Sequence, residues 1–375
     1  MRIAMLAPPW IPVPAPGYGG IEEVVRLLCE GLVERGHDVT LFAAPTSRSS
    51  ACVRPMLEDP HPDEIESARW EVDHVARAFG AIDAARSTAP FEVVHDHCGF
   101  AALAMADRLS TPLVHTVHGP LDDEGLRTFY EVHGHKATIV GISRAQLDEG
   151  PAALRDSDVV HNPLAFDEWT LCTEPGEHLL WIGRMSPVKG PHRAIRVARE
   201  AGVPLVLAGP VQPGQEEFFA GEVEPHIDDE HVRYVGELGG DDKMEAYGRA
   251  RAVLMPIRWT EPFGLVMTEA MACGTPVIAF REGSVPEVVE DGVSGFVVDD
   301  EEAMVQAVGR LDEIDRTRCR ASAEERFGVD RVVRDYEGVY ERAAARGRRY
   351  LRRRRRTDTQ PLRPPRASRI VGEAR

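Results

Sequence analysis

Short apolar runs alternate with longer helical patterns along most of this chain, and that alternation limits the fold more than any other feature. Runs of this length that are apolar at nearly every position are typical of strands buried on both faces of a parallel sheet. They form two sets of similar size. The first set is Arg2–Ala7, Asp38–Ala43, Glu92–His95, Leu113–Val117, Thr138–Ile142 and Val159–His161, and the second is Leu179–Ile182, Leu205–Ala208, Val232–Val235, Val253–Ile257, Val277–Phe280 and Gly295–Val298. The sequence therefore predicts an α/β fold with two parallel sheets in series.

The pattern also predicts a helix directly after the first run. Its apolar side chains share one helical face, and Gly36 follows the last of them. The stripe consists of Ile21, Val24, Val25, Leu28, Leu32 and Val33. A strand, an amphipathic helix and a second strand in this order form a βαβ unit.

The length of 375 residues exceeds what one core usually holds, so two domains are expected. A polar stretch with prolines at 162–177 predicts the hinge, which divides the chain into domains 1–163 and 164–330 with a cleft between them. Residues 331–350 are predicted to form a helix that crosses back onto the first domain. From Arg346 the chain is rich in Arg and Pro, and residues 351–375 are predicted to be disordered.

Charge is distributed unevenly between the body of the chain and its tail. There are 44 Lys and Arg against 61 Asp and Glu, but thirteen arginines and only two acids lie from Arg342 onward. The acidic body argues against a nucleic-acid partner and requires any phosphate site to be locally positive. The tail has two interpretations: a solvated, disordered segment, or a weak peripheral membrane contact with anionic lipid, for which it lacks an apolar face.

The segment RWTEPFGLVMTEAMACGTP, residues 258–276, combines two carboxylates with a turn and the start of a helix. Gly264 predicts a turn, and the composition of residues 265–273 predicts a helix directly after it. Free N–H groups at the start of such a helix can receive a diphosphate. Glu261 and Glu269 would repel phosphate but suit the hydroxyl groups of a ribose or a sugar. The segment predicts a nucleotide-sugar site; by itself it is also compatible with a helix start that carries two solvated glutamates.

Five more residues lie at the carboxyl ends of predicted strands, where open α/β sheets bind ligands. Gly19 and Gly20 form a tight turn before the first helix, where a phosphate can approach the backbone. Arg184 and Lys189 follow the first strand of the second set and can neutralise a diphosphate together. His118 follows a strand of the first set, so its imidazole is expected to face the cleft. Each feature alone is equally compatible with an ordinary turn, an exposed basic loop or a structural histidine.

The cysteine and histidine patterns predict no metal centre. Six cysteines are scattered without a CxxC pair, which fits a reducing cytoplasm. On a strand, His95 and His97 would share a face while Asp96 points away, and a third ligand is not evident. The acidic sequence at 156–158 is interpreted as a turn. Prolines directly after the first run favour a first strand over a signal peptide, and no apolar run is long enough to span a bilayer.

These elements, in this order, resemble the retaining glycosyltransferases of family 4, which have the GT-B fold of two facing Rossmann-like domains. The resemblance extends from Met1 to about Ala345, and its most specific part is Glu261-Pro262-Phe263-Gly264-Leu265 through Glu269-Ala270. The supporting parts are Gly19-Gly20-Ile21-Glu22, His118-Gly119, Gly183-Arg184 and Lys189-Gly190.

The resemblance implies an acceptor domain at 1–163 and a donor domain at 164–330. It implies that Arg184 and Lys189 neutralise the donor diphosphate and that Glu261 and His118 lie at the donor sugar. No metal or other cofactor is implied, because catalysis in such enzymes consists of positioning and of stabilising the leaving phosphate. The implied donor-binding set is Gly20, Phe263, Gly264, Leu265 and Glu269, and Gly19 and Gly20 would approach the acceptor.

The expected function is transfer of a hexose from a nucleotide diphosphate sugar to a small-molecule, glycan or lipid-linked acceptor, in the cytoplasm or at the inner face of its membrane. Two alternatives stay open: a nucleotide-sugar 2-epimerase of the same architecture, and a non-catalytic protein that binds sugar nucleotides. Tyr18 stands where related glycogen and starch synthases have lysine, which argues against polymer synthesis from an ADP-sugar. The sequence contains no pattern that identifies the nucleobase, the sugar, the acceptor or the oligomeric state.

Overall fold

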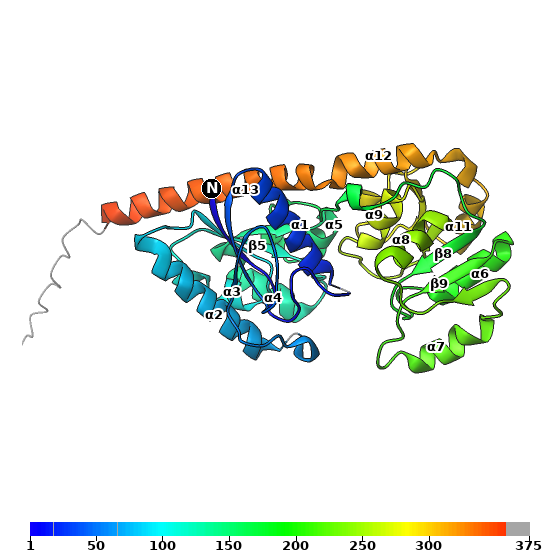
Figure 1. Ribbon diagram of the computed structural model, residues 1–375, viewed down its shortest axis with the longest axis horizontal. Coiled ribbons are helices and arrows are strands. Elements are labelled where there is room, and N and C mark those ends of the chain that lie inside the picture. The colour runs from blue at the N-terminus through cyan, green and yellow to red at the C-terminus, as the bar shows by residue number, and fades with distance from the viewer. Residues whose placement is uncertain (18, 66, 358–375) are drawn as a thin grey trace, which may run out of the picture.

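The structure is a computed structural model that describes residues 1–17, 19–65 and 67–357 of the chain. It contains two parallel sheets, one of seven strands in the order β3-β2-β1-β4-β5-β6-β7 and one of six in the order β10-β9-β8-β11-β12-β13. The two sheets belong to separate α/β domains that lie side by side in Figure 1. The prediction of an α/β fold with two parallel sheets in series is therefore confirmed.

The first domain carries its helices on both faces of the seven-stranded sheet. Helix α1 lies on one face, and α2 and α3 lie on the other. The strands are β1 Arg2–Leu6, β2 Asp38–Ala43, β3 Cys52–Pro55, β4 Val93–Asp96, β5 Leu113–Val117, β6 Thr138–Gly141 and β7 Asp158–Val159. The helices are α1 Gly20–Glu34, α2 Ala68–Ala84, α3 Ala101–Ala104, α4 Glu124–His133 and α5 Arg144–Glu149. The predicted stripe of α1 is buried along its length except for Ile21 and Val33, which are half-buried.

Two sequence expectations for this domain need correction. Strand β3 was not predicted, because Cys52–Pro55 is an edge strand with mostly exposed side chains and therefore has no apolar run. The acidic sequence at 156–158 is only in part a turn, since Asp158 begins β7 and pairs with Val140 of β6. The Asp158 carboxylate accepts a hydrogen bond from Arg342 at 2.8 Å.

The second domain is built in the same way around its six-stranded sheet. Its strands are β8 His178–Ile182, β9 Leu205–Ala208, β10 Val232–Tyr234, β11 Ala250–Met255, β12 Val277–Phe280 and β13 Gly295–Val298. Its helices are α6 Pro191–Ala201, α7 Glu216–Glu222, α8 Gly240–Arg249, α9 Leu265–Ala272, α10 Val285–Val288, α11 Glu301–Val308 and α12 Arg316–Phe327. All six predicted strands are present. Strand β11 begins before its predicted apolar run and ends at Met255, because Pro256 has no N–H group to continue the ladder.

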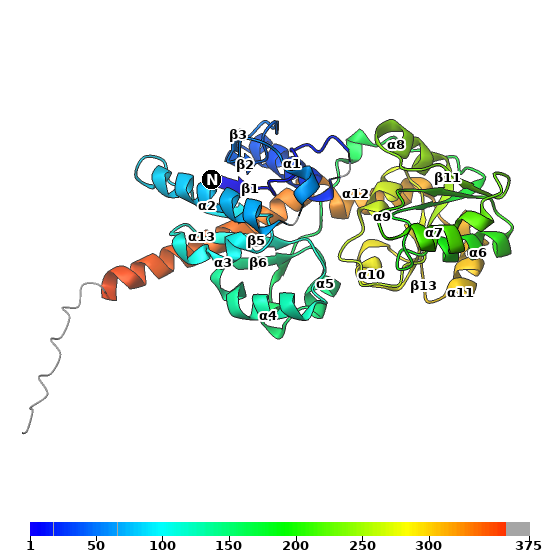
Figure 2. The same ribbon diagram turned by 90° about the horizontal axis from the view of Figure 1, so that it is seen from below.

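Helix α13, Val329–Thr357, carries the chain back from the second domain onto the first (Figure 1). Its buried residues Val332, Val333, Tyr336, Val339 and Tyr340 pack in one core with α1 and the strands of the first sheet. Figure 2 shows α12 and α13 spanning the two domains from the perpendicular direction. The crossing helix begins two residues earlier than predicted and extends to Thr357, beyond position 350, where disorder was predicted. Arginine is a good helix former and no proline occurs between Val329 and Pro361, so nothing ends the helix at position 350. Residues 358–375 lie outside the described part of the chain.

The chain passes between the domains twice, and the two connections lie against each other. Leu164, on the outward connection, donates its backbone N–H to the carbonyl of Phe327 at the end of α12, at 2.9 Å. Leu164 also forms a β-bridge with Gly328. The return connection at 327–329 therefore lies against the first part of the predicted hinge at 162–177.

Candidate active site

The order of the strands determines where each sheet can bind a ligand. Strand β1 lies between β2 and β4, and β8 lies between β9 and β11. At such switch points the following helices diverge to opposite faces, and a crevice opens beyond the carboxyl ends of the strands. The predicted residues occupy these positions: Gly19 and Gly20 lie beyond β1, Arg184 and Lys189 beyond β8, and Glu261 beyond β11.

The loop between β11 and α9 is held by a buried side chain and by its own backbone. Phe263 is 2 % exposed, and its ring packs edge-on against Phe327. Ser284 Oγ donates to the Phe263 carbonyl at 2.8 Å. Gly264 has φ +79°, in the left-handed region that favours glycine, and the chain then enters α9. No side chain caps the first turn of α9, so its backbone N–H groups can receive an anion.

Lys189 and Glu261 form an ion pair at this loop, with Lys189 Nζ 2.6 Å from Glu261 Oε2. The Nε1 of Trp259 donates to the same oxygen at 3.2 Å, and its ring lies 4.1 Å from the ammonium. Burial lowers the pKa of Lys189, Glu261 acts against this shift, and Arg184 adds to it. The two charges therefore neutralise each other before a ligand binds. A phosphate can bind to the Lys189 ammonium, and a sugar hydroxyl can donate to the Glu261 carboxylate.

Arg184 is the second predicted cation at the end of β8. It is exposed, and its Nη1 donates a long hydrogen bond of 3.4 Å to the neutral amide of Gln212. Its charge lowers the pKa of Lys189, which pairs with Glu261 of the loop before α9. Among the described residues, a carboxylate pairs with Lys189 but none pairs with Arg184.

Glu269 is oriented by two residues that the sequence did not reveal. Lys243 Nζ lies 2.6 Å from Glu269 Oε1, and the Tyr247 hydroxyl donates to Oε2 at 2.8 Å. Lys243 and Tyr247 both belong to α8, four residues apart, so they lie on one face of that helix. This spacing is the only sequence signal for the pair, and it does not indicate the partner, because α8 and α9 meet only in the folded domain.

The two domains touch at the predicted glycine turn. A Cβ atom on Gly20 would lie 3.3 Å from Cδ1 of Leu265, the first residue of α9. Nearby, the carboxylate of Glu287 in the second domain accepts the backbone N–H groups of Arg144 and Ala145 at the start of α5, at 2.8 and 2.7 Å. The structure thus brings the glycine turn and the predicted donor helix into van der Waals contact across the cleft.

His118, which is half-buried, lies at the end of a chain that includes the buried residues His95 and His97. Its Nε2 lies 2.8 Å from His97 Nδ1, and His97 Nε2 lies 3.3 Å from His95 Nδ1. His95 Nδ1 is also 2.7 Å from the Tyr340 hydroxyl of α13. Burial lowers the pKa of His118 to about 3 and the pKa of His95 and His97 well below the ordinary value. All three rings are therefore neutral near pH 7.

The positions of the atoms in this chain fit two directions of hydrogen bonding. If the Tyr340 hydroxyl donates to His95 Nδ1, His97 Nε2 donates to His95 and His118 Nε2 donates to His97, which makes His118 Nδ1 an acceptor. If His95 Nδ1 donates to Tyr340 instead, the bonds reverse and His118 Nδ1 carries the proton. Contact of His118 with a donor sugar stays a prediction.

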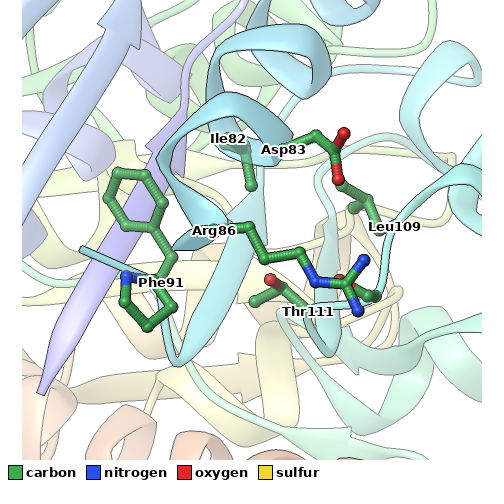
Figure 3. A pocket seen from close by; sticks show the side chains of 8 residues that line it. Ile82, Asp83, Arg86, Phe91, Leu109 and Thr111 are labelled. Carbon is green, nitrogen blue, oxygen red and sulfur yellow. The ribbon is translucent and has the colours of Figure 1, made fainter. Parts of the chain in front are cut away.

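A small, enclosed hollow in the first domain does not lie at this site. It is lined by Ile82, Asp83, Arg86, Phe91 and Leu109, among others, and its volume of about 10 Å³ is close to the minimum for one water molecule (Figure 3). These residues precede β4 and β5, so the hollow lies at the amino ends of the strands. A larger, open depression beside Pro175, Arg251 and Pro276 likewise precedes β11 and β12. Neither is where an open α/β sheet binds ligands.

Two family models match the chain in succession. The model described as Glycosyltransferase Family 4 matches residues 18–163, and the model described as Glycosyl transferases group 1 matches residues 172–326. The chain belongs to glycosyltransferase family 4. The two matches meet inside the predicted hinge. Within the described residues, no helix of this glycosyltransferase is both long and apolar enough to cross a membrane.

Relatives and solved structures agree with this assignment over nearly the whole chain. The D-inositol 3-phosphate glycosyltransferase of Mycolicibacterium smegmatis is 29 % identical, with 94 % of this chain and 96 % of the relative covered. The solved structure of AviGT4, a glycosyltransferase involved in avilamycin A biosynthesis, has 25 % identity and a TM-score of 0.66, with 92 % and 98 % covered. Anabaena HepE in complex with UDP has 20 % identity and a TM-score of 0.68, with 91 % and 100 % covered. The fold is therefore GT-B, two facing Rossmann-like domains with a cleft between them.

Proposed function

We propose that this glycosyltransferase moves a hexose from a nucleotide diphosphate sugar to an acceptor hydroxyl, with retention at the anomeric carbon. The observation that carries the proposal is the arrangement at the start of α9, where uncapped N–H groups, the cations Lys189 and Arg184, and the carboxylate of Glu261 meet. The N–H groups and cations suit a diphosphate, and the carboxylate suits a sugar hydroxyl.

The carboxylate of Glu269 is proposed to hold the ribose hydroxyls. Lys243 and Tyr247 each occupy one of its oxygens and so keep the group in one orientation. Each carboxylate oxygen can accept a second hydrogen bond, so the ribose can add its two hydroxyls without displacing either partner. The buried side chain of Phe263 holds the loop in place. The backbone N–H groups of Phe263, Gly264 and Leu265 are proposed to bind the donor from this loop.

The reaction breaks the bond between the anomeric carbon and the diphosphate oxygen, and the acceptor oxygen forms the new bond on the same face of the sugar. The acceptor proton passes to the leaving diphosphate. Negative charge grows on that diphosphate in the transition state, where Lys189, Arg184 and the start of α9 can stabilise it. Because side chains and backbone supply this positive charge, the proposal requires no metal ion.

Two comparisons guide the choice of substrates. Anabaena HepE has been solved in complex with UDP and glucose, which supports UDP-glucose as the first donor to test. The Mycolicibacterium relative is named for an inositol phosphate acceptor, which supports a polyol as the acceptor class.

The test is Glu261→Gln, which keeps the size of the side chain and removes its charge. We expect turnover to fall by roughly 100-fold, because the charged acceptor for the sugar hydroxyl is lost, while Lys189, Arg184 and the start of α9 still bind the nucleotide. Glu313→Gln, an exposed glutamate paired with Arg310, is the matched control and should behave as the unmodified protein. Normal transfer by Glu261→Gln would contradict the role given to this residue.

A further inference from the structure

Trp259 faces the ion pair of the candidate site with both its polar group and its ring. Its indole Nε1 donates to Oε2 of Glu261 at 3.2 Å, and the ammonium of Lys189 lies 4.1 Å from the centre of its ring. Lys189 Nζ donates to the same oxygen of Glu261 at 2.6 Å. The indole, the ammonium and one carboxylate oxygen are therefore all in contact with one another.

The two loops that carry these side chains are joined by other contacts. Arg193, on α6, donates from Nε to the Pro256 carbonyl after β11, at 2.7 Å. Its Nη2 donates to the Pro187 carbonyl after β8, at 2.9 Å. The indole takes no part in these bonds. The long, flexible stem of Lys189 nevertheless allows several positions of its ammonium, so the ammonium needs contacts of its own to stay in one place.

The ring of Trp259 provides one of these contacts and favours the charge on Lys189. Burial lowers the pKa of Lys189, Glu261 opposes this shift, and Arg184 adds to it. The face of a tryptophan ring attracts an ammonium group more strongly than the face of tyrosine or phenylalanine does. The ring therefore favours the protonated form of Lys189, which is the form that binds a phosphate.

The indole N–H also makes the two oxygens of Glu261 unequal. Glu261 is 8 % exposed, and both hydrogen bonds that the described residues make to its carboxylate end on Oε2. An oxygen of this kind has two lone pairs, so the ammonium and the indole together fill Oε2. A ligand hydroxyl that donates to this carboxylate is therefore directed to Oε1.

Building on the proposed function, we infer that Trp259 is a positioning residue for the donor sugar, which holds Lys189 on Oε2 of Glu261 so that Oε1 accepts a hydrogen bond from one hydroxyl group of the hexose. Trp259 acts through its two neighbours and needs no contact with the sugar itself. Without the indole N–H, the carboxylate can turn and the hexose is held less firmly.

This arrangement also determines what a glutamine at position 261 would offer. Lys189 and the indole can only donate, so they select the amide oxygen of Glu261→Gln at the place of Oε2. The amide NH2 group then takes the place of Oε1 and presents a donor to the hexose hydroxyl. The contact with the hexose is thereby already weakened, and removal of the indole N–H should change little more in that variant.

The test is calorimetric titration of the full chain with UDP, GDP and ADP, and then with the glucose, galactose and mannose conjugates of the nucleotide that binds. The variant is Trp259→Phe, which keeps a ring and removes the N–H group. We expect the dissociation constant of the bound conjugate to rise by roughly threefold to tenfold and that of the free nucleotide to change by less than about twofold. No acceptor is needed for this measurement.

Trp70→Phe is the matched control, because Trp70 belongs to α2 in the first domain and also has a cation, Arg69, over its ring at 4.3 Å. It should bind both ligands as the unmodified protein does. Trp259→Leu removes the ring as well, so the free nucleotide should also bind more weakly, by roughly threefold to tenfold, because the charge on Lys189 is less favoured. A thermal melt confirms that each variant is folded.

The decisive comparison repeats Trp259→Phe in the Glu261→Gln background. We expect almost no further loss of conjugate binding there, whereas a role of Trp259 in the fold alone would give the same factor in both backgrounds. That equal factor, unchanged conjugate binding by Trp259→Phe, equal weakening of conjugate and nucleotide, or binding of the nucleotide but of no conjugate would each overturn the inference. Failure of the proposed function is distinguishable, because the unmodified protein would then bind none of the three nucleotides.

Discussion

At the scale of residues, the site consists of buried and half-buried charges that compensate one another. Lys189 is held by Glu261 and by the ring of Trp259, and Glu269 is held by Lys243 and Tyr247. Such pairs contribute little to net stability but hold each charge in a fixed place. The carboxyl group of Glu22, in the first turn of α1, is buried, so its charged form should cost stability.

This cost leads to an expectation about pH. Because the folded-state pKa of Glu22 is raised by burial, the fold favours its protonated form. This group therefore favours the fold most at pH values below its pKa in the unfolded chain. That part of the stability is lost as the pH rises through its pKa in the folded protein, whereas a residue that cannot ionise shows no such loss. Glu22→Gln should therefore raise the Tm of the ligand-free protein by roughly 1–3 °C at pH 7.5 and change it little near pH 4.5. Thermal unfolding across this range checks the expectation, and a gain that does not grow with pH would contradict it.

At the scale of elements, the start of α9 depends on a glycine in a conformation that other residues adopt only with strain. Alanine at position 264 would have φ near +79°, and its Cβ would lie 2.7 Å from Met267 Cε and 3.3 Å from Glu261 Cγ. We expect Gly264→Ala to lose about 1–2 kcal/mol of stability and to weaken nucleotide binding, because the loop that carries Glu261 must shift.

Gly292→Ala is the control for this effect. Gly292 has φ +75° in the same domain, and a Cβ there would have no neighbour within 4 Å. It should show a similar loss of stability in thermal unfolding and no loss of affinity for nucleotide. Equal affinity for nucleotide in both variants would show that the Gly264 turn does not form the binding site.

The elements also show what the sequence could and could not reveal. Central strands such as β12 are predictable because both of their faces are buried and the run is apolar throughout. The edge strand β3 is not, because its side chains are mostly exposed. Glu261 and Glu269 could be predicted from one segment, whereas Trp259, Lys243 and Tyr247 acquire their roles only through contacts between side chains in the folded domain. The acidity of Glu22 was visible in the sequence, but its burial was not.

At the scale of the whole molecule, helix α13 ties the second domain to the first. Two glycines let it approach closely: a Cβ on Gly31 of α1 would meet Val333, and a Cβ on Gly347 would meet Pro112. The hydroxyl of Tyr340, on the same helix, lies 2.7 Å from His95 Nδ1, at the start of the histidine chain that ends at His118. The crossing helix therefore contributes both to the docking of the domains and to the hydrogen-bonded chain that contains one predicted site residue.

The central claim is that the second domain holds a nucleotide diphosphate between Arg184, Lys189 and the start of α9. Calorimetric and thermal-shift titrations with UDP, GDP and ADP test it most directly, with Arg184→Ala as the variant and Arg196→Ala, whose side chain pairs with Glu301, as the control. A nucleotide at about 100 times its dissociation constant should stabilise the native state by roughly 2.7 kcal/mol. We expect this stabilisation with one of the three nucleotides, retained in Arg196→Ala and largely lost in Arg184→Ala. Absence of binding by all three, or equal binding by Arg184→Ala and the unmodified protein, would contradict the account.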